Sequence, residues 1–161
     1  MTNGDFIHSV KRNNQRLFLI ALSFTKSAHD AEDILQNVFL KLWKYPKDFE
    51  NEEHIDKWLT AVCVNESRNY IKAFFRNHLS LEQNEIVSPH IFDSSAQQDI
   101  FNAVMALPKK DRTVIHLFYY EDLSVKDIAD LLGLKEAAVK TRLSRARTKL
   151  KERLGDDWIY E

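Results

Sequence analysis

Eight Lys and Arg side chains fall within residues 135–154 against only two Glu side chains, which gives this stretch a net charge of +6. Ammonium and guanidinium groups bind phosphate, and Arg can also donate two hydrogen bonds to the edge of a guanine. Apolar residues recur here at the three- and four-residue spacing of one helix face, at Val139, Leu143, Ala146, Leu150 and Leu154. The cations therefore occupy the other faces of a predicted helix, and the pattern indicates binding to a nucleic acid duplex.

A shorter helix is predicted immediately before the basic one. Ile128, Ala129 and Leu132 form its apolar face at helical spacing. Ser124 precedes it as a candidate N-cap, and Gly133 can take the left-handed conformation that ends a helix and turns the chain. Two such helices are typical of a helix-turn-helix, whose second helix enters the major groove. A basic amphipathic helix can instead be a solvated surface or bind an acidic partner, but the cap and the turn favour DNA.

Three amphipathic helices are predicted in the first half of the chain. The first extends over residues 6–24, with an interruption expected near Asn13-Asn14. The second extends over residues 28–45 and ends at Pro46, because proline cannot continue a helix. The third extends over residues 54–76, again with an apolar face at helical spacing.

The composition sets the fold class and the domain organisation. Only three Gly and three Pro occur in 161 residues, which favours helices over a turn-rich β fold. Residues 79–96 contain three acidic residues, no Lys or Arg and four Ser, which is typical of a linker. We therefore predict an all-α protein with two small helical domains, at 1–78 and 97–161, joined by an acidic linker at 79–96. The C-terminal domain is predicted to be a helix-turn-helix.

The sequence lacks the patterns that catalysis or metal binding requires. Its six His residues are scattered without the spacing of metal ligands, and no Gly-rich phosphate loop occurs. Cys63 is the single cysteine, so no intramolecular disulfide can form, and its apolar surroundings predict a core position. No signal peptide and no apolar stretch of bilayer length is apparent. We expect a cytoplasmic protein without membrane insertion, enzymatic activity, cofactor or metal.

Three motifs occur in order along the chain. They are DAEDILQNVFLKLW at 30–43, WLTAVCVNESRNYI at 58–71 and LPKKDRTVIHLFYYEDLSVKDIADLLGLKEAAVKTRLSRARTKL at 107–150. Together they resemble the extracytoplasmic-function sigma factors, the smallest specificity subunits of bacterial RNA polymerase. The resemblance implies a monomeric factor that binds core RNA polymerase, recognises minus-35 and minus-10 promoter DNA and promotes DNA opening for transcription initiation. An anti-sigma factor is a further partner that it implies.

The first motif resembles the helix that docks on the largest polymerase subunit. Its polar residues lie at helical spacing, where they can meet Lys or Arg of a partner. The residues that the resemblance assigns to core-polymerase binding are Asp30, Glu32, Asp33, Gln36 and Phe39. Asp30 can alternatively serve only the first turn of the helix, where the dipole favours an acid, and Phe39 can belong to the core. Trp43 is expected in the core.

The second motif resembles the element that recognises and melts minus-10 DNA, and the loop Lys47–Glu53 before it resembles a pocket for a flipped base. Arg and Lys can hold phosphates of the opened strand, Asn can hydrogen-bond a base edge, and an aromatic ring can stack on a base. The residues assigned to minus-10 DNA binding are Phe49, Asn65, Arg68, Asn69 and Lys72. Trp58 is expected in the core.

The third motif resembles the reader of the minus-35 element. The residues assigned to minus-35 DNA binding are Lys140, Thr141, Arg142, Ser144, Arg145 and Arg147. Arg142 and Arg145 are about one turn apart and are expected to face one groove, but which Arg reads a base stays open. The chain departs from the family's usual Gly-Thr at Ala137-Ala138, which removes a hydroxyl that can donate to a phosphate.

Three other classes of function compete with this interpretation. A transcription regulator that recruits polymerase would share the C-terminal motif but needs a dimerising or ligand-sensing N-terminal domain. An enzyme with an accessory DNA-binding domain lacks support in the residues, and a helical adaptor would bind proteins alone. The acidic linker at 79–96 can either mimic RNA in a positively charged polymerase channel or serve as a simple tether, and its apolar residues can dock the domains or bind a partner.

Overall fold

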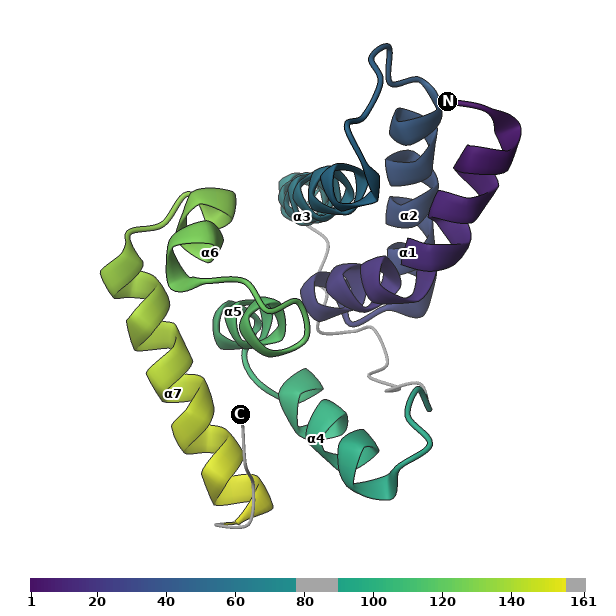
Figure 1. Cartoon of the computed structure of the whole chain (residues 1–161). Coiled ribbons are helices and arrows are strands. Elements are labelled where there is room, and N and C mark those ends of the chain that lie inside the picture. Colours follow the sequence, from purple (N-terminus) through teal and green to yellow (C-terminus); the bar gives the residue numbers. More distant parts are fainter. Residues whose placement is uncertain (78–89, 156–161) are drawn as a thin grey trace. The chain divides into compact units, whose positions relative to one another are not determined.

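The computed structural model describes residues 1–77 and 90–155, and every regular element within these ranges is an α-helix (Figure 1). The helices belong to two compact units, an N-terminal and a C-terminal one. The prediction of an all-α chain with two helical domains is confirmed. Within the described ranges, no helix combines the length and the apolar character needed to cross a bilayer.

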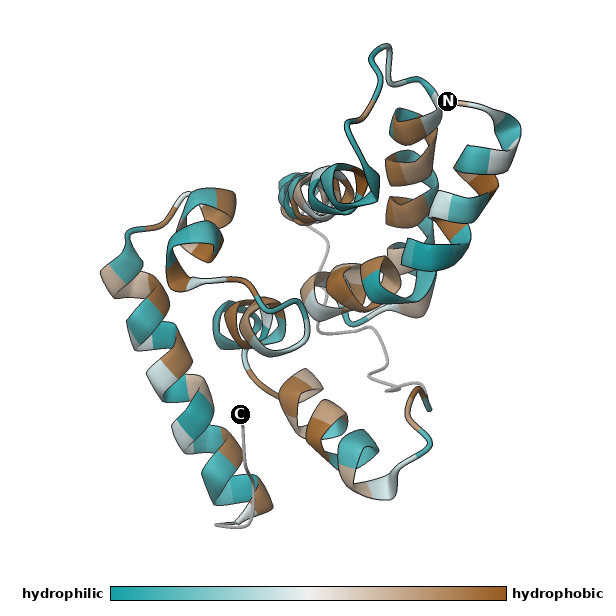
Figure 2. Ribbon diagram, viewed as in Figure 1, coloured by the Kyte–Doolittle hydropathy of each residue, from teal (hydrophilic) through white to brown (hydrophobic). Residues whose placement is uncertain are grey.

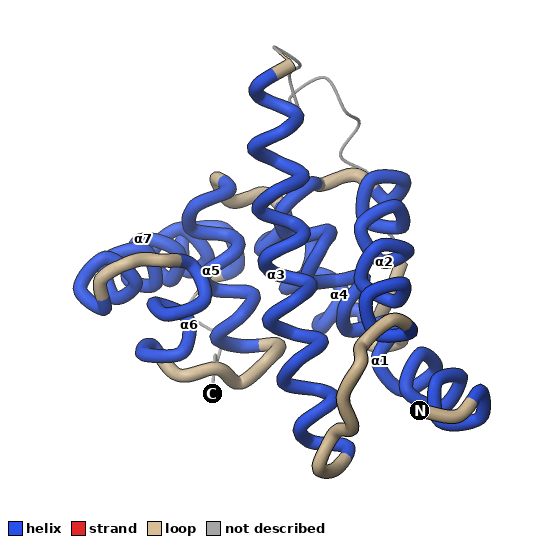
Figure 3. Tube along the Cα trace, turned by 90° about the horizontal axis from the view of Figure 1, so that it is seen from above, coloured by secondary structure: helices blue, strands red, loops and turns tan. Residues whose placement is uncertain are grey.

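Over residues 1–77, the N-terminal unit consists of three long helices, namely α1 (Asn3–Thr25), α2 (Ala28–Trp43) and α3 (Glu52–Arg76). Each of them packs against the other two. The fully or almost fully buried side chains of this unit include Leu17, Ile20, Ile34, Val38, Leu59 and Cys63. The core position of Cys63 is thereby confirmed. Seen from above, the C-terminal part of α3 projects beyond α1 and α2 (Figure 3).

Helix α1 is continuous, so the interruption expected near Asn13-Asn14 does not occur. The amide of Asn13 is 1% exposed and donates to the Ser9 carbonyl at 2.9 Å and to the Asp56 carboxylate at 3.1 Å. Arg12 also binds Asp56, through a nitrogen 2.7 Å from Oδ1. Asn13 is therefore a buried polar link from α1 to α3. Asn is unfavourable inside a helix because its side chain competes for backbone hydrogen bonds, but here the side chain is held by these partners and the helix continues.

In its described residues, the C-terminal unit has four helices, namely α4 (Ser95–Met105), α5 (Lys109–Tyr119), α6 (Val125–Leu132) and α7 (Glu136–Leu154). Helix α5 packs against each of the other three. Apolar and polar residues alternate along α7 in brown and teal, as expected for a helix with one buried side (Figure 2). Helix α7 packs on α4, α5 and α6 with this buried side.

The turn between α6 and α7 has the predicted chemistry. The Ser124 hydroxyl accepts a hydrogen bond from the Asp127 backbone N–H at 3.0 Å, which caps α6. Gly133 ends α6 with φ at +64°, a left-handed conformation that a residue with a Cβ rarely adopts. The Leu134 N–H then donates to the Ala129 carbonyl at 2.9 Å. Both sequence predictions for this turn are confirmed.

The end of the predicted linker belongs structurally to the C-terminal unit. Helix α4 already begins at Ser95. The backbone N–H groups of Ile91 and Phe92 donate to Gln98 Oε1 at 2.8 and 3.0 Å, and the Phe92 ring lies 5.7 Å from the Phe101 ring. The apolar residues 91 and 92 therefore pack on their own unit. Residues 79–89 of the predicted linker lie outside the described residues.

Candidate nucleic-acid interface

Helix α7 separates a buried side from an exposed one. Its buried residues are Val139, Leu143, Ala146 and Leu150, each at most 2% exposed, as the spacing predicted. The residues assigned to DNA that are exposed are Lys140, Thr141, Ser144 and Arg145. Because they fall on the side away from the buried stripe, we refer to these four residues as the outer face of α7. Arg142 is half-buried at its flank.

Three small side chains near the start of α7, those of Ala137, Ala138 and Thr141, limit the hydrogen bonds that this part of the helix can donate to DNA. Thr141 Oγ1 donates to the Ala137 carbonyl at 3.0 Å, so its proton is used within the helix. Ala137 is exposed and Ala138 is half-buried, and neither carries a hydroxyl. The first turns of α7 therefore offer DNA the ammonium of Lys140 more than any hydroxyl donor.

Arg147 does not lie on the outer face, contrary to its assignment to DNA. Its Nε donates to Tyr119 Oη at 3.3 Å, and its guanidinium lies over the Phe118 ring, 5.3 Å from the centroid. It follows Ala146 on the helix and therefore flanks the buried stripe. Its aliphatic stem and its charge are used in packing α7 on the aromatic end of α5.

Helix α2 places its assigned residues in three different environments. Glu32 and Gln36 are exposed, Asp33 is half-exposed with a carboxylate oxygen 3.7 Å from His29 Nε2, and Phe39 is half-buried. Leu40 and Trp43 are 52% and 50% exposed. The exposed residues Glu32, Gln36, Leu40 and Trp43 follow one another at helical spacing, and we call them the α2 stripe. Sequence reasoning missed Leu40 and wrongly placed Trp43 in the core, although Leu40 lies outside the spacing of the buried stripe of α2.

Asp30 is not available as a surface contact. It is 8% exposed and its Oδ1 accepts a hydrogen bond from the Tyr70 hydroxyl at 2.7 Å. Burial, together with this hydrogen bond to the carboxylate, raises the pKa of Tyr70 above its ordinary value. The assignment of Asp30 to polymerase binding is therefore corrected to a structural link between α2 and α3.

Helix α3 presents a polar stripe along its exposed side. Asn65, Asn69 and Lys72 are exposed at spacings of four and three residues, so they share one face, whereas Arg68 is half-buried. Phe75 follows three residues after Lys72 and is 54% exposed. We call Asn65, Asn69, Lys72 and Phe75 the α3 stripe. Phe75 was not singled out from the sequence, although an aromatic residue next to exposed cations is a signal for base stacking.

The loop before α3 is organised by an aromatic cluster. The Phe49 ring stacks on Tyr45 with centroids 4.5 Å apart and meets the edges of His54 at 5.1 Å and Trp58 at 5.6 Å. Phe49 and Trp58 are both half-buried. Trp58 therefore supports the loop and does not belong to the fully buried core that was expected.

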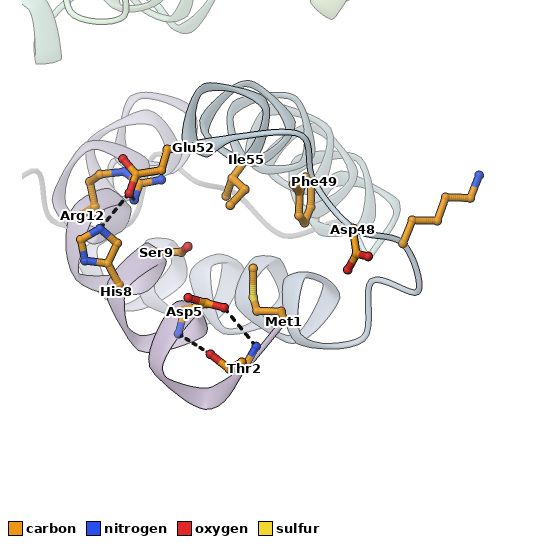
Figure 4. A pocket seen from close by; sticks show the side chains of 11 residues that line it. Met1, Thr2, Asp5, His8, Ser9, Arg12, Asp48, Phe49, Glu52 and Ile55 are labelled. Carbon is orange, nitrogen blue, oxygen red and sulfur yellow. Dashed lines mark hydrogen bonds and ion pairs between the residues drawn. The ribbon is translucent and has the colours of Figure 1, made fainter.

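A cavity of about 310 Å³ opens beside this loop. Phe49 and Ile55 lie along one side of it, and Met1, Thr2 and Asp5 from the start of the chain lie opposite (Figure 4). Its remaining lining residues are His8, Ser9, Arg12, Lys47, Asp48 and Glu52. Glu52 accepts a hydrogen bond from the His8 ring at 3.1 Å and pairs with Arg12 at 3.3 Å, so the cavity has polar, partly neutralised walls next to one aromatic ring.

The described residues contain no group of three or more His, Cys, Asp or Glu side chains that could hold a metal ion. The assigned site residues lie on α2, α3 and α7 and, in the case of Phe49, in the loop before α3.

Two family models match the chain in the same order as these surfaces. Sigma-70 region 2 matches residues 10–73, which include α2 and most of α3. Sigma-70 region 4 matches residues 97–150, which include the helix-turn-helix. Together the two matches take in more than two thirds of the chain.

The chain belongs to the extracytoplasmic-function sigma factors.

This sigma factor is similar in sequence to several curated sigma factors. The RNA polymerase sigma factors SigV and SigM of Bacillus subtilis are 27% and 28% identical to it, with 90% and 91% of this chain and 88% and 92% of those proteins covered. RfaY of Xanthomonas campestris pv. campestris, named a probable RNA polymerase sigma factor, is 30% identical over 84% of this chain. The chain spans 36% of the length of RfaY.

Two solved structures resemble this sigma factor along most of its length. The sigma factor RpoE in complex with the anti-sigma factor NepR from Bartonella quintana matches with a TM-score of 0.71 and 26% identity, covering 96% of this chain and 99% of that one. CnrH in complex with the cytosolic domain of CnrY matches with a TM-score of 0.59 and 26% identity, covering 98% and 92%. Sigma factors direct RNA polymerase to promoters, and this sigma factor has both promoter-recognising regions.

Proposed function

We propose that this sigma factor joins core RNA polymerase through α2, holds opened minus-10 DNA on α3 and the preceding loop, and reads the minus-35 element with α7, without catalysing a reaction itself. The observation that carries the proposal is the outer face of α7. Its four residues are exposed while the opposite side of α7 packs on α4, α5 and α6, which is the geometry in which a helix-turn-helix presents its second helix to the major groove. The surrounding Lys and Arg residues would add phosphate contacts.

The α2 stripe supports polymerase binding by its chemistry. Its N-terminal end is acidic and amide-bearing, at Glu32 and Gln36, and its C-terminal end is apolar, at Leu40 and Trp43. An exposed Trp side chain is typical of a protein interface, where Trp is enriched among the residues that contribute most of the binding energy. Leu40 adds apolar surface beside it. A complementary partner surface would offer Arg or Lys to the first end and an apolar pocket to the second.

The α3 stripe supports binding to a single strand. The amides of Asn65 and Asn69 can hydrogen-bond base edges, Lys72 can hold a phosphate, and the exposed ring of Phe75 can stack on a base. Phe49 and the cavity beside it lie before the same helix and are a place for an unstacked base. Exposed amides together with an exposed ring suit melted DNA better than duplex, whose bases are already stacked.

We also propose that the protein acts in the cytoplasm and is held inactive by an anti-sigma factor. The sigma factor RpoE named above is bound to the anti-sigma factor NepR, and CnrH is bound to the cytosolic domain of CnrY. The exposed apolar residues Leu40 and Trp43 make the α2 stripe a surface that a regulator can cover, which would block polymerase at the same time. Copurification of a partner that competes with core polymerase, and that is lost on Trp43→Ala, tests this part.

Reconstituted transcription tests the proposal as a whole. Purified chain, the native core polymerase and a genomic promoter library are combined, and run-off transcripts are sequenced. We expect transcripts that depend on the chain and share one minus-35 and minus-10 pair. A chain that binds specific duplex DNA without core polymerase, and adds no transcripts, would instead be a recruiting regulator.

A further inference from the structure

A buried carboxylate lies beneath the proposed reading helix, at a residue that sequence reasoning did not single out. Asp111 is in the first turn of α5 and is 3% exposed. Its Oδ1 lies 3.3 Å from a terminal nitrogen of Arg145, and its Oδ2 accepts a hydrogen bond from Lys149 Nζ at 3.1 Å. Oδ1 makes no hydrogen bond to the described residues, so its ion pair with Arg145 is what compensates for its burial.

The acid and the two cations differ in their freedom to move. The side chain of Asp111 is 4% exposed, while those of Arg145 and Lys149 are 53% and 43% exposed. Asp111 is fixed by the packing of α5 and lies in its first turn, where the helix dipole stabilises an anion. The guanidinium carries five N–H donors in a planar fork. One terminal nitrogen of Arg145 is paired with Asp111, and about half of the Arg145 side chain is exposed.

We propose that Asp111 is a positioning residue for minus-35 recognition, which holds Arg145 in the orientation that contacts DNA and offsets part of the positive charge of α7. This inference rests on the proposed reading of minus-35 DNA by α7. An Arg held in place loses less conformational freedom on binding, which strengthens its specific contact. A carboxylate beside Arg145 and Lys149 weakens the attraction of both cations to any phosphate. Asp111 therefore increases specific binding and decreases non-specific binding.

The variant Asp111→Asn separates these effects from a loss of structure. It keeps the volume and one acceptor oxygen but removes the charge. We expect the holoenzyme to bind a promoter duplex selected by run-off transcription more weakly, and the same duplex with a scrambled minus-35 element more tightly, because Arg145 and Lys149 are released. The ratio of the two affinities should fall about fivefold or more, the lower end of what one good Arg–guanine pair contributes. A purely structural role would weaken both affinities.

Two matched variants show whether Asp111 acts through Arg145. In an Arg145→Ala background, Asp111→Asn should leave the affinity ratio unchanged, because the positioned side chain is gone. Lys149→Ala removes the other ion pair and should preserve the ratio. Arg145 and Lys149 are half-exposed and can be hydrated when released, so Asp111→Asn should fold, and circular dichroism verifies it.

The outcomes distinguish this inference from the function on which it rests. The positioning role alone is overturned if the unmodified chain discriminates the two duplexes but Asp111→Asn leaves the affinity ratio unchanged. It is also overturned if Asp111→Asn lowers the ratio equally with and without Arg145. An unmodified chain that does not discriminate them overturns the proposed function and this inference with it. A ratio that falls only when Arg145 is present is the result that we expect.

Discussion

His116 makes the C-terminal unit sensitive to acid. Its imidazole is fully buried, stacks on the Tyr120 ring with centroids 4.9 Å apart, and has no hydrogen-bond partner for either nitrogen among the described residues. Burial lowers the pKa of His116 to about 3, because the charged form would lose its hydration. The folded unit therefore keeps this ring neutral at a pH where the unfolded chain protonates it.

The sign and size of the effect follow from this difference in pKa. The ordinary pKa of His is 6.5, so below that pH the unfolded chain binds a proton that the folded chain does not. Stability is therefore fully present above pH 6.5 and is lost as the pH falls toward 3. At pH 4.5, about two units below the unfolded value, the free energy of unfolding should be lower by about 2.7 kcal/mol through His116 alone.

The variant His116→Leu removes the titrating group and keeps a similar volume. Between pH 7 and pH 4.5, the free energy of unfolding of this variant should fall by about 2–3 kcal/mol less than that of the unmodified chain. Hydrogen exchange of α5 and α7 amides, corrected for intrinsic rates, reports on this unit, and α3 amides report on the other. His90→Leu, at an exposed His of the same unit, is the matched control. Equal pH sensitivity of the unmodified chain and His116→Leu would refute the reasoning.

Three further outcomes follow from the positions of single side chains. Leu40→Ala together with Trp43→Ala should weaken core-polymerase binding about tenfold or more in a pull-down titration, because Trp43 is the expected anchor. Circular dichroism should stay unchanged, because about half of each side chain is exposed. Arg147→Ala should lower the stability of the C-terminal unit by about 1 kcal/mol, through the lost contact with the aromatic end of α5, and should not change minus-35 preference; a shifted promoter preference would contradict this packing role. Tyr70→Phe should lower the free energy of unfolding of the N-terminal unit by about 1–3 kcal/mol, because Asp30 is left buried without its hydrogen-bond donor. Hydrogen exchange in α2 and α3 measures this loss, and unchanged exchange in α2 would show that water replaces the hydroxyl.

The parts of the fold that depend on neighbours in sequence were predictable. Helix α6 begins after Ser124 and ends at Gly133 as expected, because a cap and a left-handed turn depend on residues within one helical turn. The buried stripe of α7 also followed from spacing alone, because a helix that packs on one side must repeat its apolar residues at that period.

The fate of individual polar and aromatic side chains was less predictable. Asp30 is bonded to a tyrosine 40 residues away, and Asn13 to an aspartate 43 residues away. Arg147 reaches an aromatic residue 28 positions earlier in the chain. Sequence spacing assigns a residue to a face but does not show what the neighbouring helix offers there, and these partners decide whether a polar group faces inward. Trp43 shows the converse, because the neighbouring elements leave half of its ring uncovered.

One comparison of two variants tests the central division of labour between α7 and α2. The first variant is Lys140→Ala with Arg145→Ala, on the outer face, and the second is Gln36→Ala with Trp43→Ala, on the α2 stripe. Core-polymerase binding and minus-35-dependent run-off transcription are measured for both. We predict that the first variant loses minus-35-dependent transcription with core binding intact, and that the second loses core binding. Equal loss of core binding in both variants would contradict the assignment of DNA reading to α7 and polymerase binding to α2.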